Sequence, residues 1–112
     1  MIKELIIDNK VVKFKASAST SVYYREMFNA DMLKQLSHLY NAYSSAGVMD
    51  SDSLETFAKI AYTMAKQADP TISLGFTEWL DEFAVFPIDV IFPELMELWQ
   101  SSLTTLDEAK KK

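Results

Sequence analysis

Clusters of carboxylates are the first groups in this 112-residue chain whose spacing could support chemistry. Glu78, Asp81 and Glu82 fall on one side of a helical turn, and Glu94 and Glu97 repeat the spacing further along. Paired carboxylates can exchange protons in acid–base catalysis or hold a hard cation. Acidic side chains also favour the first turn of a helix, where they interact with its dipole, and Glu78 and Glu94 fall there. We therefore interpret both clusters as solvated helix faces.

Other residue types that catalysis requires are scarce. His38 is the only histidine, cysteine is absent, and the two glycines, Gly47 and Gly75, are far apart. No glycine elbow lies beside a serine, and a phosphate-binding loop needs clustered glycines. Gln35 stands three residues before His38, where a helical di-iron motif carries Glu. The sequence predicts that the protein is not an enzyme and has no catalytic, cofactor-binding or metal site.

Acidic and aromatic residues dominate the second half of the chain. Between Asp69 and Glu108 there are nine acidic residues and no Lys or Arg. Exposed aromatic side chains beside carboxylates are typical of a surface that binds a protein partner. We expect Phe57 and Trp99 in the core, and Phe86 and Phe92, which neighbour prolines, to be partly exposed. The predicted partner-binding residues are Trp79, Glu82, Phe83, Phe86, Phe92, Glu94 and Glu97.

Composition and charge indicate one soluble domain. Hydrophobic residues make up 49% of the chain and charged residues 24%, within the usual range for globular domains. Residues 1–49 carry six basic and four acidic groups, and residues 50–112 carry five basic and twelve acidic groups. Nucleic-acid binding requires clustered basic residues, so nucleic acid is a poor partner. No apolar run of about 20 residues and no signal peptide is present, so we expect neither membrane insertion nor export.

The N-terminal region predicts a β-hairpin. Residues 2–7 and 11–15 are β-prone, and the Asp8-Asn9 dipeptide between them tolerates the left-handed backbone of a tight turn. In the second run, Val12, Phe14 and Ala16 share the face that should be buried. Lysines in this run are interpreted as a solvated strand edge, where they discourage pairing with other strands.

Two helices should follow the hairpin. Residues 22–28 predict a short helix that Asn29 can end in the left-handed conformation. Asp31 is a suitable N-cap for the next helix. Its buried stripe is predicted to comprise Leu33, Leu36, Tyr40 and Tyr43, flanked by Met32 and Leu39.

Three further helices are predicted. Asp52 and Glu55 have the spacing of a capping box before an amphipathic helix that ends at Asp69. Its apolar stripe comprises Leu54, Phe57, Ile60, Ala61, Met64, Ala65 and Ala68. Thr77 is expected to cap a short helix. Proline is tolerated in the first turn of a helix, so we expect a turn over residues 87–91 and the last helix from about Pro93.

These elements predict an α+β fold, mainly α, in which a small N-terminal hairpin precedes a bundle of about five helices. Residues 1–112 form one domain, divided into a hairpin over 1–16, a helical core over 20–103 and a flexible lysine-rich tail over 104–112.

Several segments together resemble the tail assembly chaperones of long-tailed bacteriophages and of prophages in Gram-positive bacteria. They are VVKFKAS, YYREMFNADMLKQL, FAKIAYTMAKQAD, FTEWLDEF and PELMELWQ, followed by the lysine-rich end. The family would place a glycine between the two early helices, where this chain has Asn29.

The resemblance implies a non-enzymatic chaperone that binds the tape measure protein in the host bacterial cytoplasm and keeps it soluble during tail morphogenesis. It also implies a longer, frameshifted form of the chain, for which an A-rich run encoding Lys110 to Lys112 is a suitable slippery site. Adaptable methionines and an acidic surface suit an apolar, basic client. Homo-oligomerisation stays open.

Two alternatives remain. A structural tail component, such as a connector or completion-type protein, would stay in the virion. A small prophage regulatory protein would need a basic recognition helix, and no basic residue lies between Lys66 and Lys110.

Overall fold

The chain begins with a β-hairpin in the computed structural model, which describes residues 2–46 and 50–111, with side chains for 2–44 and 50–102. Strand β1 (Ile2–Ile7) pairs antiparallel with β2 (Lys10–Lys15). Asp8 and Asn9 form the two-residue turn with φ values of 53° and 64°, as predicted. Phe14 and Ala16 are buried on the predicted inner face, where β2 packs on a helix.

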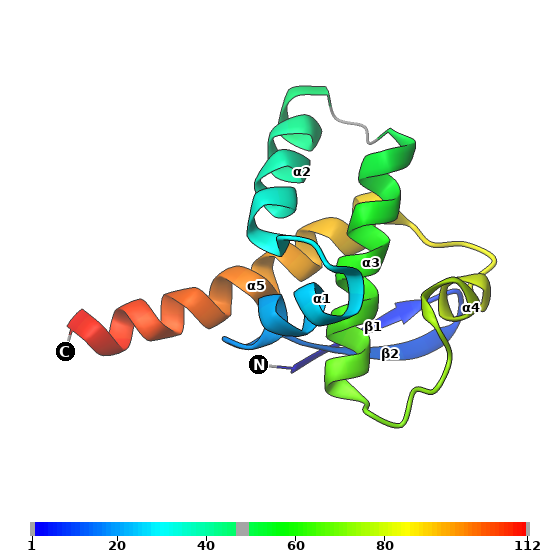
Figure 1. Ribbon diagram of the computed structural model, residues 1–112, viewed down its shortest axis with the longest axis horizontal. Coiled ribbons are helices and arrows are strands. Elements are labelled where there is room, and N and C mark those ends of the chain that lie inside the picture. Colours follow the sequence, from blue (N-terminus) through cyan, green and yellow to red (C-terminus); the bar gives the residue numbers. More distant parts are fainter. Residues whose placement is uncertain (1, 47–49, 112) are drawn as a thin grey trace.

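Five helices follow in the described part of the chain, so the predicted α+β class is confirmed. They are α1 (Thr20–Phe28), α2 (Met32–Ala46), α3 (Ser51–Ala68), α4 (Phe76–Asp81) and α5 (Ile88–Lys111). Figure 1 shows α3 at the centre, with the other elements arranged around it. Helix α3 contacts each of the other helices and β2.

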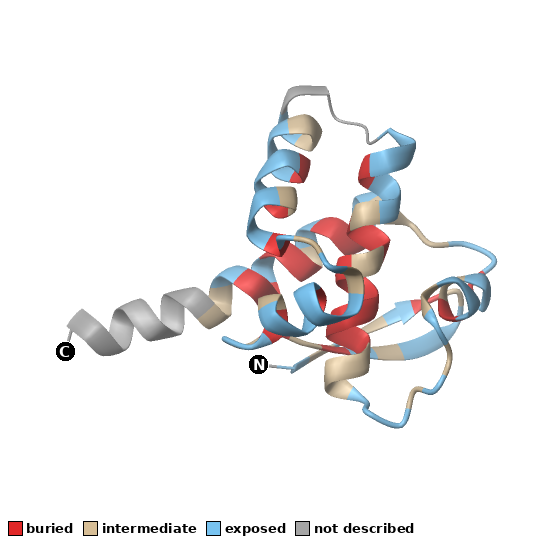
Figure 2. Cartoon of the chain, viewed as in Figure 1, coloured by how far each residue is buried: buried red, intermediate tan, exposed pale blue. Residues whose placement is uncertain are grey.

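The central position of α3 follows from its apolar residues. Its predicted stripe is buried from Phe57 to Ala65, and small residues such as Ala58 and Ala61 allow neighbouring elements to approach closely. Leu54, in the first turn of α3, is exposed instead. Figure 2 shows buried residues concentrated along α3 and along the part of α5 that crosses it.

The backbone signals at helix ends are confirmed in part. Asn29 ends α1 with φ 51°, and Asp31 Oδ1 accepts a hydrogen bond from the Lys34 N–H at 3.2 Å. The predicted Asp52 cap is wrong, because Asp50 Oδ1 accepts the bond from the Ser53 N–H at 2.8 Å. With Asp50 as its N-cap, α3 begins two residues earlier than predicted, and Asp52 lies in its first turn.

The start of α4 also differs from the prediction. Gly75, and not Thr77, is the N-cap residue. The Gly75 N–H donates to Glu78 Oε1 at 3.2 Å, which satisfies a backbone group at the start of the helix. The earlier start lets Phe76 contact Phe28 and Tyr62, with ring centroids 5.8 and 6.0 Å apart.

Helix α5 begins at Ile88 and includes Pro93, so the predicted start near Pro93 is wrong. The N–H groups of Val90 and Ile91 donate to the Pro87 carbonyl at 3.1 and 3.0 Å, which closes the first turn. Burial of Ile91 before the proline and Leu95 after it holds one face of the helix against the core. The helix continues to Lys111, past the predicted boundary at residue 103.

Candidate functional site

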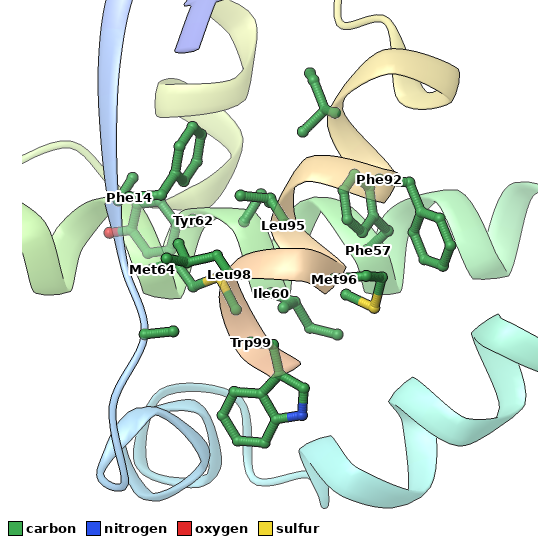
Figure 3. Packing of buried hydrophobic residues seen from close by; sticks show 14 of the residues in the cluster. Phe14, Phe57, Ile60, Tyr62, Met64, Phe92, Leu95, Met96, Leu98 and Trp99 are labelled. Carbon is green, nitrogen blue, oxygen red and sulfur yellow. The ribbon is translucent and has the colours of Figure 1, made fainter. Parts of the chain in front are cut away.

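The aromatic residues predicted to bind a partner lie mostly in the core. Trp79, Phe83 and Phe92 are buried, and Phe86 is half-buried. The rings of Trp79 and Tyr62 of α3 have centroids 5.6 Å apart, and those of Phe57 and Phe92 are 5.3 Å apart. These contacts attach α4 and α5 to the interior, so the expected exposure of Phe92 is wrong. Burial of Phe57 and Trp99 is confirmed (Figure 3).

Of the acidic residues predicted to bind a partner, Glu94 and Glu97 form ion pairs within the protein, whereas the Glu82 side chain is exposed to solvent. Glu94 Oε2 lies 2.6 Å from Lys3 Nζ, and Glu97 Oε1 lies 3.8 Å from the same nitrogen. The hydrogen bond to Glu94 raises the pKa of Lys3. This group of charges links β1 to α5. Glu82 is exposed, and its carbonyl oxygen accepts a hydrogen bond from Lys10 Nζ at 2.7 Å.

His38 lies in a shallow depression between α2 and α3, beside Asp50 and Asp52. Hydrogen bonds from Ser53 lower the pKa of Asp50, and they hold its carboxylate at the N-terminus of α3. Among the described side chains, no group of three or more His, Cys, Asp or Glu residues could hold a metal ion.

Helix α2 presents a different face to the core from the one predicted. Met32, Leu36 and Leu39 are buried, whereas Leu33 and Tyr40 are 56% and 52% exposed. The predicted stripe containing Leu33 and Tyr40 is therefore wrong, and the face of α2 that is buried lies about one residue around the helix from it. The cause is tertiary, because α2 packs on α3 and its Tyr43 ring meets the Phe92 ring of α5 at 4.8 Å.

Exposed apolar residues of α2 form one wall of a groove against α5. Leu33 and Tyr40 are seven residues apart, which is two helical turns, so they lie on the same side of α2. Met96 and Trp99 of α5 line the opposite side, and Leu36 also contributes. Figure 3 shows the Trp99 indole reaching from α5 toward the helices of the N-terminal half.

The groove has a volume of about 330 Å³ and no charged residue in its lining. Its polar members are the neutral side chains Ser37, Asn41 and Gln100. An apolar floor with an uncharged polar rim suits the apolar face of a helix, which would lie between α2 and α5 and bury Leu33 and Tyr40. We define the α2–α5 groove by Leu33, Leu36, Tyr40, Met96 and Trp99.

Sequence analysis missed this groove because it assigned Leu33 and Tyr40 to the core. A signal was nevertheless present. Six large apolar residues (Met32, Leu33, Leu36, Leu39, Tyr40 and Tyr43) cover more of the circumference of α2 than one neighbouring helix can bury.

Comparisons with known proteins give no match among models of protein families, curated proteins or solved structures. Within the described ranges, the helices are too short or too polar to cross a lipid bilayer.

Proposed function

We propose that this protein is a non-enzymatic tail assembly chaperone of a phage or prophage, which binds the tape measure protein in the bacterial cytoplasm. The observation that carries the proposal is the uncharged apolar α2–α5 groove, with Leu33 and Tyr40 exposed at its edge. An amphipathic helix of the client would cover these side chains and the floor formed by Met96 and Trp99. Binding would hide the apolar face of the client helix, and that face is the cause of its aggregation.

The acidic surface supports this role. Glu78, Asp81, Glu82 and Asp89 are exposed, and the chain carries a net charge of −5. A protein of high net charge repels its own copies and stays soluble while it holds an apolar client. The resemblance to tail assembly chaperones names the client, and the groove provides the chemistry that would recognise it.

The test is co-expression with the tape measure protein from the same phage or prophage. Wild-type chain should keep the client soluble and co-purify with it. The L33E/Y40E variant places two charges at the groove and should lose both effects. The V85E/V90E variant is the matched control, because Val85 and Val90 are each 59% exposed and lie outside the groove.

Either of two results would contradict the proposal. One is a client that stays insoluble when co-expressed with the wild-type chain. The other is an L33E/Y40E variant that keeps the client soluble as well as the control variant does. Mass spectrometry of purified particles distinguishes the structural alternative, since a chaperone is absent from the finished tail and a connector is retained.

A further inference from the structure

Strand β2 has an open edge. The sheet has two strands, so β1 pairs with one side of β2 only. Within the described residues, the main chain of β2 makes no hydrogen bond to any element other than β1. Every second residue of a strand directs its N–H and C=O groups away from the partner strand. The outer side of β2 therefore offers a row of main-chain donors and acceptors that can pair with another strand.

A groove runs beside this edge. Four consecutive β2 residues, from Lys10 to Lys13, line it on one side, and residues 71–74 line it on the other. Trp79 of α4 and Phe83, which follows this helix, also contribute to the lining. Its charged members are Lys10, Lys13, Asp69 and Glu82. The groove has a volume of about 680 Å³. Four residues of an extended peptide span roughly 13 Å, so the groove gives a peptide access to most of β2.

A second depression continues along the strand. Lys15 lines it at the end of β2, together with Tyr23 and Met27 of α1 and Lys66 of α3. Both depressions reach the C-terminal end of α3, where Asp69 lines the first and Pro70 the second. Tyr23 and Met27 are exposed and provide apolar contact area for the end of a bound peptide.

The outward face of β2 determines which strand can pair with it. Val11, Lys13 and Lys15 occupy every second position of β2 and share this face, and Val11 is 64% exposed. Lys13 Nζ lies 3.9 Å from Glu4 Oε2, both exposed, which makes a weak ion pair. Lys15 and Lys66 have no ion pair with any described residue. Lysines repel a second copy of β2, whereas carboxylates directly across the strand stabilise pairing.

We propose that β2 binds an extended acidic peptide of a partner protein as a third strand. The peptide carries an apolar residue beside Val11 and carboxylates beside Lys13 and Lys15, so these three side chains lie at alternate positions. Main-chain hydrogen bonds to the open edge supply affinity, and the two lysines supply the charge preference. The lining of this site shares no residue with the α2–α5 groove, so each surface can be altered without changing the lining of the other.

The test is a selection of random peptides displayed on phage against the immobilised full chain. Enriched peptides should carry two carboxylates two residues apart, with an apolar residue two positions beyond them. Their affinity should fall about tenfold or more on the K13E/K15E variant. The R25E/K34E variant is the matched control, because it reverses two exposed basic residues outside both depressions and should bind as wild type does.

Main-chain pairing has its own readout. N-methylation of an enriched peptide removes one N–H at a time, and in a paired strand only alternate N–H groups face β2. Binding should therefore be lost at every second position and kept at the positions between them. An equal effect at all positions would overturn the third-strand arrangement.

The selection itself can also overturn the proposal. It fails if no peptide is enriched, or if the enriched peptides lack carboxylates or bind K13E/K15E as tightly as wild type. Peptides that lose binding only on L33E/Y40E would occupy the α2–α5 groove, which would reject the β2 site and leave the tail chaperone proposal standing.

Discussion

Replacing Trp99 by Ala tests the core and the floor of the α2–α5 groove together. The side chain is 7% exposed and packs between α5 and the N-terminal helices. A buried tryptophan removes roughly 150 to 250 Å² from water, which at about 25 cal/mol per Å² corresponds to about 4 to 6 kcal/mol. Solvent can enter the vacated space from the groove, which reduces the free-energy cost of the cavity. We expect W99A to lower the free energy of unfolding by about 3 to 5 kcal/mol.

Urea unfolding at equilibrium measures this loss. Trp79 is the remaining tryptophan, and it is 4% exposed, so its fluorescence reports unfolding in the variant. Y40A is the control, because an exposed ring at the groove wall should cost less than about 1 kcal/mol. A domain of this size is stable by about 5 to 15 kcal/mol, so W99F covers the case in which W99A does not fold. A loss below about 1 kcal/mol for W99A would refute the burial of this ring.

Three further predictions concern a helix, an acidic group and a phenol. P93A restores an N–H group inside α5 and should raise the free energy of unfolding by about 1 to 2 kcal/mol in urea; a decrease would contradict the assignment of Pro93 to the helix interior. The pKa of Asp50 is lowered from 3.8 by the hydrogen bonds from Ser53, so its stabilising effect is present above that pH and is lost as the pH falls through the folded-state value. D50N should therefore show a smaller drop in the urea midpoint than wild type between neutral pH and about pH 2, and equal drops would exclude this contribution. Burial raises the pKa of Tyr24 from 10.0 to about 12, so its contribution is present below pH 10 and is lost as the pH rises toward 12; Y24F should lose less stability than wild type over that range, and parallel alkaline curves would contradict it.

Sequence reasoning succeeded where neighbouring residues decide the structure. The Asp8-Asn9 turn and the end of α1 at Asn29 depend on which residues tolerate a left-handed backbone, and that is a local property. Most of the apolar stripe of α3 could also be predicted, because the helix is long and its apolar periodicity extends over several turns. The resemblance to tail assembly chaperones also came from the order of residues, and it stays a prediction.

Tertiary packing decided the candidate site. Leu33 and Met32 are adjacent apolar residues on α2, and the position of α3 and α5 determines which of them is buried. Phe92 was expected at the surface beside Pro93, but its ring meets Phe57 and Tyr43 across three helices. Hydrophobicity measures the gain from burial without specifying the neighbour that provides it. The sequence by itself therefore determined the type and order of the elements and their apolar content, whereas long-range packing determined which apolar residues remained exposed to form the groove.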